Sequence, residues 1–288
     1  MSWPRSRRNR IVSREEKYKL FRALHERPGA FVIPNPWNAG TARILTALGF
    51  EALATTSAGY AFDAGRLDSS AGLTREGVLE NAKAIVEATH LPVSADLEDG
   101  FGRSPAACAE TIGLAAGIGL AGGSIEDATG DPAAPIYDFA LAADRVAAAA
   151  ETARTRQFVL TARAENFLHG RPDLGDTIRR LQAFEEAGAD VLYAPGLPSL
   201  DAIRSVCASV SKPVNVVMGL KGAAYTVGEL GAAGVRRISV GGAFARAALG
   251  AFVRAALEVR DQGTFGFAAD AMPYAEVRSY MDSSKRQA

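Results

Sequence analysis

The sequence predicts a single-domain (β/α)8 (TIM) barrel, and three observations lead to this prediction. Eight short apolar runs alternate with alanine-rich segments of helical periodicity. Several helical segments end in glycine before the next apolar run, as in Leu48-Gly49-Phe50 and Ala233-Gly234-Val235, the C-cap pattern of helix–strand junctions. No linker divides the 288 residues, a length that suits one large barrel.

The expected strands and helices alternate along the whole chain. Strands are expected at Phe31–Pro34, Ala52–Thr56, Val93–Asp96, Gly123–Ile125, Val159–Ala162, Val191–Ala194, Val214–Val217 and Arg237–Val240. Helices are expected at Thr41–Leu48, Arg75–Ala88, Pro105–Ala116, Ala140–Ala153, Asp176–Ala187, Leu200–Ser209 and Val227–Ala233. A doubly wound sheet would alternate similarly, but it usually has fewer strands, and no G-x-G-x-x-G follows the first run here.

The two ends of the chain extend this barrel. Residues 1–12 are expected to be a disordered basic tail. They lack the apolar core of a secretory signal, so they are not interpreted as one. The barrel domain, residues 13–288, is expected to begin with a helix at Ser13–Arg27, capped by Ser13. A long helix with an apolar face is expected at Ala247–Arg260, after the last strand.

Composition excludes several classes of partner. Net charge is zero and the pI is near 6.9, so we expect no nucleic-acid partner and no anionic membrane surface. No apolar run approaches the roughly 20 residues that span a bilayer. The two cysteines, Cys108 and Cys207, are far apart in predicted helices and are interpreted as buried thiols of a reducing compartment. We therefore predict a cytoplasmic protein.

Three carboxylates follow the third apolar run within four residues. Asp96, Glu98 and Asp99 precede a glycine-rich turn. Like charges this close raise one another's pKa unless a cation neutralises them, and Mg²⁺ prefers such an oxygen-rich, partly hydrated site. A solvated acidic turn is the alternative reading of the same pattern.

In a barrel the carboxyl ends of all strands meet at one face, where chemistry is expected. The expected strand ends carry Asn35-Pro36-Trp37-Asn38, Thr56-Ser57-Ala58-Gly59-Tyr60, Asp96-Leu97-Glu98-Asp99, Glu126-Asp127, Arg163-Ala164-Glu165-Asn166, Ala194-Pro195-Gly196, Met218-Gly219 with Asn215 just inside, and Gly241-Gly242. Several acids and one arginine at one mouth indicate a metal ion with an anionic ligand.

Five motifs resemble, in order, those of the isocitrate lyase/phosphoenolpyruvate mutase superfamily, over roughly residues 20–260. They are Thr56-Ser57-Ala58-Gly59, Asp68 ahead of Ala71-Gly72-Leu73-Thr74, Asp96-Leu97-Glu98-Asp99-Gly100-Phe101-Gly102, Ile125-Glu126-Asp127 and Ala162-Arg163-Ala164-Glu165. The third resembles the family's D-x-D-x-G-Y-G metal motif, with Glu in place of the second Asp.

The resemblance implies a Mg²⁺ or Mn²⁺ cofactor and a small 2-oxo or dicarboxylic acid substrate. Asp96 is implied as the direct metal ligand, with Glu98 and Glu126 holding metal-bound waters. The implied substrate-binding residues are Ser57, Ala58, Gly59, Arg163 and Asn215. Arg163, Asp68 and Ser57 are the implied catalytic residues. Arg163 would oppose the charge of an enolate, and Asp68 would orient a metal-bound water or face the leaving group.

Two departures from the family narrow the expected reaction. The family's lyases carry a Lys-Lys/Arg-Cys-Gly-His loop after the I-E-D motif, whereas Ala128–Tyr137 contains no Cys, Lys or His. Ala194-Pro195 replaces a glutamate after the sixth strand. We therefore expect a branch without the catalytic cysteine loop. Four residues remain candidates for the group that handles protons in place of that cysteine: Tyr60, Glu165, Tyr193 and His169.

The expected function is a Mg²⁺-dependent lyase or decarboxylase that cleaves a C–C bond of a small 2-oxo or 2-hydroxy acid. The alternatives are a phosphonate P–C bond hydrolase or mutase of the phosphonopyruvate type, and a non-catalytic paralogue that binds a 2-oxo acid. The family also implies a homo-oligomer, a dimer or tetramer, in which C-terminal helices such as Ala247–Arg260 are swapped between subunits.

Overall fold

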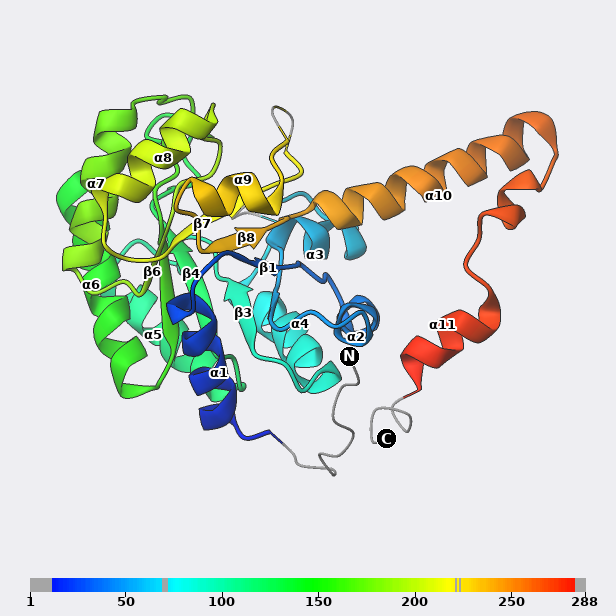
Figure 1. The fold of residues 1–288 in the computed structure, drawn as a ribbon, viewed down its shortest axis with the longest axis horizontal. Coiled ribbons are helices and arrows are strands. Elements are labelled where there is room, and N and C mark those ends of the chain that lie inside the picture. The colour runs from blue at the N-terminus through cyan, green and yellow to red at the C-terminus, as the bar shows by residue number, and fades with distance from the viewer. Residues whose placement is uncertain (1–11, 69–71, 221, 223, 283–288) are drawn as a thin grey trace.

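Eight parallel strands form one sheet in the computed structural model, which describes residues 12–68, 72–220, 222 and 224–282 (Figure 1). The strands are β1 (Phe31–Ile33), β2 (Leu53–Ala54), β3 (Val93–Asp96), β4 (Gly122–Glu126), β5 (Val159–Arg163), β6 (Val191–Tyr193), β7 (Val214–Val217) and β8 (Arg237–Ser239). Their order is β1-β8-β7-β6-β5-β4-β3-β2. The Ala54 N–H donates to the Pro34 carbonyl at 3.0 Å, so β2 reaches the end of β1 and the barrel is nearly closed. The predicted (β/α)8 barrel is confirmed.

The helices follow the strands as predicted, with shifts of a few residues at their ends. They are α1 (Arg14–Glu26), α2 (Ala39–Ala47), α3 (Ser57–Asp63), α4 (Arg75–Ala88), α5 (Pro105–Gly117), α6 (Phe139–Thr155), α7 (Leu174–Glu186), α8 (Leu200–Ser209), α9 (Val227–Ala232), α10 (Ala243–Gln262), η1 (Gly266–Ala269) and α11 (Tyr274–Met281). Ser13 caps α1 in a capping box with Glu16, which satisfies N–H groups that no helical carbonyl reaches.

The segment after β2 differs from the prediction. The expected strand Ala52–Thr56 is shortened to two residues because Thr56 leaves the sheet and caps a helix, α3. Its hydroxyl accepts from the Gly59 N–H at 3.3 Å. The motif Thr56-Ser57-Ala58-Gly59 therefore forms the start of a helix, and η1 and α11 are likewise elements that the sequence pattern did not predict.

The predicted basic tail falls almost entirely outside the described residues, which begin at Val12. None of the described helices is long and apolar enough to cross a membrane. The apolar core lies between the sheet and the surrounding helices, where Leu97, Ile112 and Phe158 are almost fully buried. The cysteines follow the prediction in part, since Cys108 is buried and Cys207 is half-buried.

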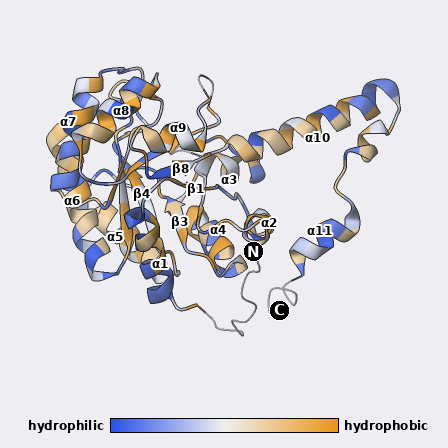
Figure 2. Ribbon diagram, in the orientation of Figure 1, coloured by the Kyte–Doolittle hydropathy of each residue, from blue (hydrophilic) through white to orange (hydrophobic). Residues whose placement is uncertain are grey.

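The C-terminal arm leaves the barrel. Figure 1 shows α10 projecting from the barrel and the chain turning back through η1 to α11. Among the 20 residues of α10 only Ala245 is buried. Apolar residues recur along this helix (Figure 2), and Phe252 is 68% exposed.

Candidate functional site

The carboxyl ends of the strands enclose a cavity of about 180 Å³ at the mouth of the barrel. Of the residues predicted for the site, six line this cavity: Ser57, Ala58, Asp68, Asp96, Arg163 and Asn215. The other three, Gly59, Glu98 and Glu126, lie next to this lining. The strand ends therefore bring together residues that are up to 158 positions apart in the chain, from Ser57 to Asn215.

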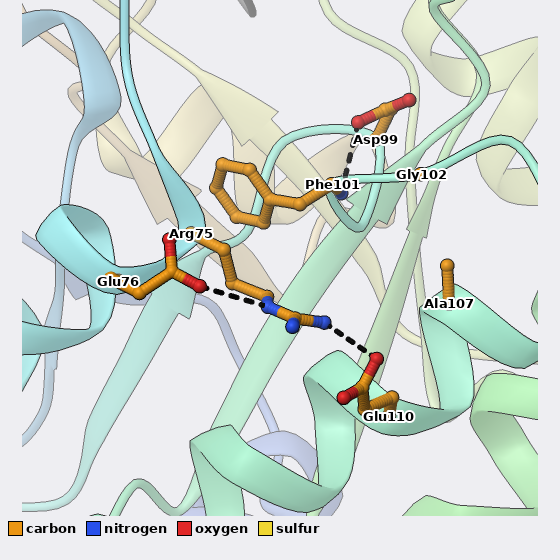
Figure 3. A pocket seen from close by; sticks show the side chains of 7 residues that line it. All are labelled: Arg75, Glu76, Asp99, Phe101, Gly102, Ala107 and Glu110. Atoms are coloured by element: carbon orange, nitrogen blue, oxygen red, sulfur yellow. Dashed lines mark hydrogen bonds and ion pairs between the residues drawn. The ribbon is translucent and has the colours of Figure 1, made fainter.

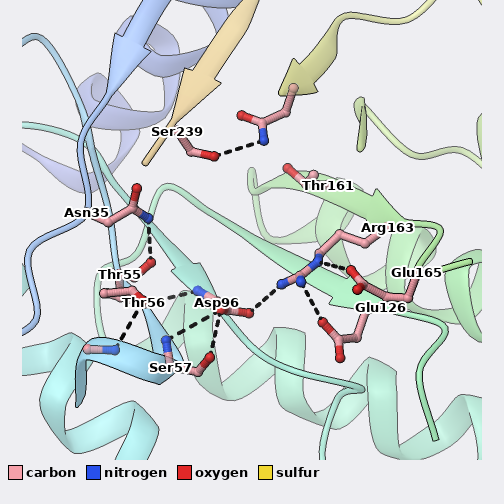
Figure 4. Close-up of polar contacts among 12 residues, drawn as sticks. Asn35, Thr55, Thr56, Ser57, Asp96, Glu126, Thr161, Arg163, Glu165 and Ser239 are labelled. Atoms are coloured by element: carbon pink, nitrogen blue, oxygen red, sulfur yellow. Dashed lines mark hydrogen bonds and ion pairs between the residues drawn. The ribbon is translucent and has the colours of Figure 1, made fainter. Parts of the chain in front are cut away.

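Arg163, at the end of β5, is the centre of the charged network (Figure 4). Its three nitrogens each meet one carboxylate: Asp96 at 2.9 Å, Glu126 at 3.0 Å and Glu165 at 2.8 Å. Burial opposes the charge, but the attraction of Glu126, Glu165 and Asp96 holds the pKa of Arg163 well above its usual value. A guanidinium has five N–H donors, so donors remain for a substrate oxygen.

Asp96 joins this network to α3. Its Oδ1 accepts from Arg163, while its Oδ2 accepts from the Ser57 hydroxyl at 3.0 Å and from the Ser57 N–H at 3.4 Å. The Asp96 N–H in turn donates to the Thr55 hydroxyl at 3.0 Å. Contacts on both oxygens fix the orientation of this carboxylate toward the mouth.

The backbone N–H groups of Ser57, Ala58 and Gly59, the implied substrate-binding residues at the start of α3, are only partly open to a ligand. The Ser57 N–H contacts Asp96 and the Gly59 N–H is taken by Thr56, which leaves the Ala58 N–H for a ligand. Gly59 is buried against its neighbours, because a Cβ there would lie 2.8 Å from the Trp37 Cβ. The absence of a side chain at Gly59 therefore serves packing.

Glu98 carries a buried carboxylate oxygen without a partner. Its Oε1 has no hydrogen bond within the described part of the chain, and its backbone adopts a φ of 51°, a region that side chains rarely occupy. Burial, followed by repulsion from Asp96, raises the pKa of Glu98 to about 8. A buried carboxylate held in this way is suited to receive a cation or a cation-bound water.

Glu126 and Asp68 complete the acidic surroundings. Burial raises the pKa of Glu126 well above its usual value despite the nearby Arg163. Asp68 lies on the rim of the cavity and is exposed as a residue. Partial burial of its carboxylate, followed by repulsion from Asp96, raises its pKa. Together with Asp96, Glu98 and Glu165, these acids outnumber the one guanidinium at their centre, which favours a cation at the mouth.

The donor set fits a hard divalent cation held through few direct ligands. Within residues 12–68, 72–220, 222 and 224–282, no three His, Cys, Asp or Glu side chains converge as a ready metal cage. Mg²⁺ usually binds through one or two carboxylates and keeps several waters. Asp96 as direct ligand, with the unpaired Glu98 oxygen and Glu126 on waters, is compatible with that mode.

Two residues that the sequence did not place in the site hold it in shape. Asp127, buried behind the mouth, accepts from the Glu165 N–H at 2.8 Å and from Arg180 at 3.0 Å. Arg180 also donates to the Tyr137 carbonyl at 3.0 Å. The sequence signal that could have indicated this Arg180–Asp127 contact is an arginine on the inner face of the amphipathic helix α7. A buried arginine needs a charged or polar partner.

Asp99 does not face the mouth, although it belongs to the same acidic cluster. Its Oδ2 accepts from the Tyr137 hydroxyl at 2.9 Å, and its Oδ1 accepts from the Phe101 N–H at 3.0 Å. Asp99 falls on an unspecified position of the D-x-D-x-G-Y-G motif, which agrees with its place outside the mouth. The acidic turn is thus divided between the mouth and the packing behind it.

A second hollow, of about 500 Å³, lies outside the barrel between α4 and α5 (Figure 3). Arg75 there spans two acids, Glu76 at 3.8 Å and Glu110 at 2.8 Å. Of the predicted acidic cluster only Asp99 lines it, and none of the residues predicted to bind metal or substrate or to act in catalysis does. We therefore assign the site to the smaller cavity at the strand ends.

This fold and these residues define a (β/α)8 barrel with an acidic, arginine-centred mouth. The chain belongs to the phosphoenolpyruvate phosphomutase family, whose model matches residues 21–260, within the isocitrate lyase/phosphoenolpyruvate mutase superfamily. The predicted family is confirmed. Members of this superfamily include lyases and mutases.

Three comparisons indicate how near the relatives are. A solved lyase/mutase candidate from Burkholderia cenocepacia is 56% identical, with a TM-score of 0.91 over 94% of this chain and 97% of that one. An uncharacterised protein of Mycobacterium tuberculosis is 32% identical over 90% of this chain and 95% of its own length. The 2-methylisocitrate lyase of Escherichia coli is 28% identical over 68% of each chain.

Proposed function

We propose that this protein is a Mg²⁺- or Mn²⁺-dependent lyase or decarboxylase that cleaves a C–C bond of a small 2-oxo or 2-hydroxy acid. The observation that carries the proposal is the contact of Arg163 with three carboxylates beside the unpartnered oxygen of Glu98. This arrangement fixes one positive charge and leaves carboxylate capacity for a second cation. Arg163 and Asp96 both line the cavity.

The proposed cation and the residues of the chain contribute different parts of the chemistry. A bound divalent cation would supply the positive charge that opposes the negative charge developing on the substrate oxygens. Asp96 would hold this cation, with Glu98 and Glu126 fixing its waters. Arg163 would bind the developing oxyanion with its remaining N–H donors, and the Ala58 N–H would bind the substrate carboxylate.

Decarboxylation of oxaloacetate illustrates the step. The bond to the distal carboxylate breaks, its electron pair passes to the enolate of pyruvate, carbon dioxide leaves, and the enolate then takes a proton at carbon. Tyr193 is the donor that we favour among the four open candidates. It lines the cavity, its ring lies 5.1 Å from the Arg163 guanidinium carbon, and Glu165 is occupied by Arg163. This step needs no cysteine, consistent with the sequence of residues 128–137.

The test is pyruvate release from oxaloacetate and from a 2-methylmalate-type acid, measured with Mg²⁺ and with EDTA. We expect turnover only with the metal, and we expect Asp96→Asn to lower kcat/KM by about 10²-fold or more. Glu110→Gln, in the hollow outside the barrel, is the matched control and should match the wild type. Equal turnover in EDTA, or an active Asp96→Asn variant, would contradict the proposal.

A phosphonate P–C bond hydrolase or mutase is the second candidate, favoured by the family whose model matches residues 21–260. Phosphonopyruvate separates the two: release of pyruvate with free phosphate supports the second candidate. Metal-dependent oxalate binding without turnover of any substrate would instead support a non-catalytic binding protein.

We also propose a homo-oligomer, a dimer or tetramer, in which α10 packs on a second copy of the chain, whereas α11 contacts α2 of its own chain through Arg43 and the Met281 carbonyl at 2.8 Å. The support is the projection of α10 from the barrel with its apolar residues exposed (Figures 1 and 2). These exposed residues are Phe244, Leu249, Phe252, Val253, Leu257 and Val259. Such a row is costly in water and favours burial against a partner.

A further inference from the structure

The interior of the barrel beneath the mouth is polar and lined by small side chains. Ser94, Ser124, Asn215 and Ser239 line the cavity below Asp96. Large branched apolar residues usually fill this part of a (β/α)8 barrel. Because small residues replace them here, the cavity extends from Arg163 at the mouth down to Arg237 on β8.

Arg237 forms the inner end of this cavity, and its side chain is held from three sides by neutral groups. Its Nε donates to Asn215 Oδ1 at 2.8 Å and its Nη2 donates to the Thr161 hydroxyl at 3.0 Å. Its Nη1 lies 3.4 Å from Nε2 of His25. These contacts use one hydrogen on each nitrogen, so two of the five N–H donors remain.

The positive charge of Arg237 has no carboxylate partner within the described residues. No ion pair of Arg237 is formed there, in contrast to the three around Arg163, although Arg237 is only 5% exposed. Burial lowers its pKa to about 10, so the group remains charged at neutral pH. A buried charge is costly unless an opposite charge meets it.

The two arginines lie one layer apart. Arg237 contacts Thr161, which stands two residues before Arg163 on β5. Side chains two residues apart on a strand share a face and lie about 7 Å apart along it. This spacing suits a small molecule with an anionic group at each end.

We propose that Arg237 binds a second anionic group of the substrate, so that the enzyme selects small acids with two anionic groups. The metal-binding end of such a substrate lies at Asp96 and Arg163, and its distal carboxylate points into the barrel. Asn215, predicted to bind substrate directly, positions Arg237, because its amide oxygen accepts from Arg237 and its nitrogen donates to Ser239 at 3.1 Å. This inference rests on the function proposed above.

The experiment measures binding by calorimetry in the presence of Mg²⁺, without need of turnover. The probes are pyruvate, which has one carboxylate, and 3,3-difluorooxaloacetate, which has the same 2-oxo acid end and a distal carboxylate. We expect the wild type to prefer the second by about 10- to 100-fold, the range for a hydrogen bond to a charged group. Arg237→Met should remove most of this preference and change pyruvate affinity far less.

Two further variants keep the test decisive if Arg237→Met folds poorly. Thr161→Val removes one hydrogen bond that orients Arg237 and should reduce the preference part of the way. Arg237→Lys retains a charge and should keep more of the preference than Arg237→Met. An unchanged preference in Thr161→Val and Arg237→Lys, or a wild type without preference, would overturn the inference while leaving the proposed function intact. A wild type that bound neither probe with Mg²⁺ would overturn both.

Discussion

The guanidinium of Arg145 lies directly over the ring of Tyr137, with its central carbon 4.0 Å from the ring centroid. Arg145, on α6, is 1% exposed and donates to the carbonyls of Gly102 and Arg103 at 2.6 Å each and to the carbonyl of Asp99. Tyr137 in turn donates to Asp99. This pair therefore fixes the turn that follows Glu98 from behind, although neither residue faces the cavity.

Replacement of Arg145 by methionine should destabilise the protein by about 2–5 kcal/mol. Three part-buried carbonyls would lose the donor that the buried Arg145 supplies, and each such loss costs roughly 1–3 kcal/mol if it is not compensated. Urea unfolding measures the change. Arg103→Met is the matched control, since Arg103 approaches the same ring at 5.8 Å from the exposed side and should cost less than about 1 kcal/mol. Similar losses in both variants would contradict the role of Arg145.

Replacement of Glu98 by glycine should stabilise the metal-free protein and weaken its response to Mg²⁺. Glycine adopts the φ of 51° without strain, and the change removes a buried carboxylate oxygen that has no partner among the described residues. We expect a higher melting temperature in EDTA and a smaller rise on addition of Mg²⁺.

The control for Glu98→Gly is Gln157→Gly, because Gln157 also has a positive φ, 50°, but lies on the exposed surface. This control should gain only the backbone contribution, of about 0.4–1 kcal/mol, and keep the full Mg²⁺ response. A Glu98→Gly variant with the wild-type Mg²⁺ shift would show that Glu98 does not serve the cation.

Acid should destabilise the protein through His25 as the pH falls below about 6.5. Burial, and then the charge of Arg237, lower the pKa of His25 from 6.5 to about 3. Below pH 6.5 His25 binds a proton in the unfolded chain but stays neutral in the folded chain. The free energy of unfolding therefore falls progressively from that pH down to about 3. His25→Gln should flatten the profile of unfolding free energy against pH in this window. His169→Gln, in the loop after β5, should leave the wild-type slope, and equal slopes in all three proteins would exclude His25 as the cause.

Substitution of Phe252 by aspartate should shift the protein toward smaller assemblies. Phe252 is 68% exposed on α10, and a charge in its place would oppose burial against a second copy. Light scattering after size exclusion measures the mass. Leu20→Asp is the control, since Leu20 is 53% exposed on α1, at the opposite end of the chain. A wild type of monomer mass, or a Phe252→Asp variant of unchanged oligomeric mass, would contradict the proposed assembly.

The sequence by itself determined the barrel and the face on which the site lies. Helix caps such as Ser13, glycine C-caps such as Gly188 and the short apolar runs are local signals, read within a few residues of one another. Eight alternations without the G-x-G-x-x-G of a doubly wound sheet then favour the barrel, and its geometry assigns Asp96 and Arg163 to the same mouth. Those parts needed no knowledge of which side chains meet.

Only the tertiary structure decided which of these groups are already occupied. Thr56 caps α3 because the chain leaves the sheet there, Asp99 turns toward Tyr137, and Arg163 meets acids from β3, β4 and the loop after β5. Arg237 reaches across the barrel to Thr161. These choices depend on side chains brought together from distant strands, whose distances and burial fix the charge balance. The spacing of residues along the sequence therefore does not predict these contacts.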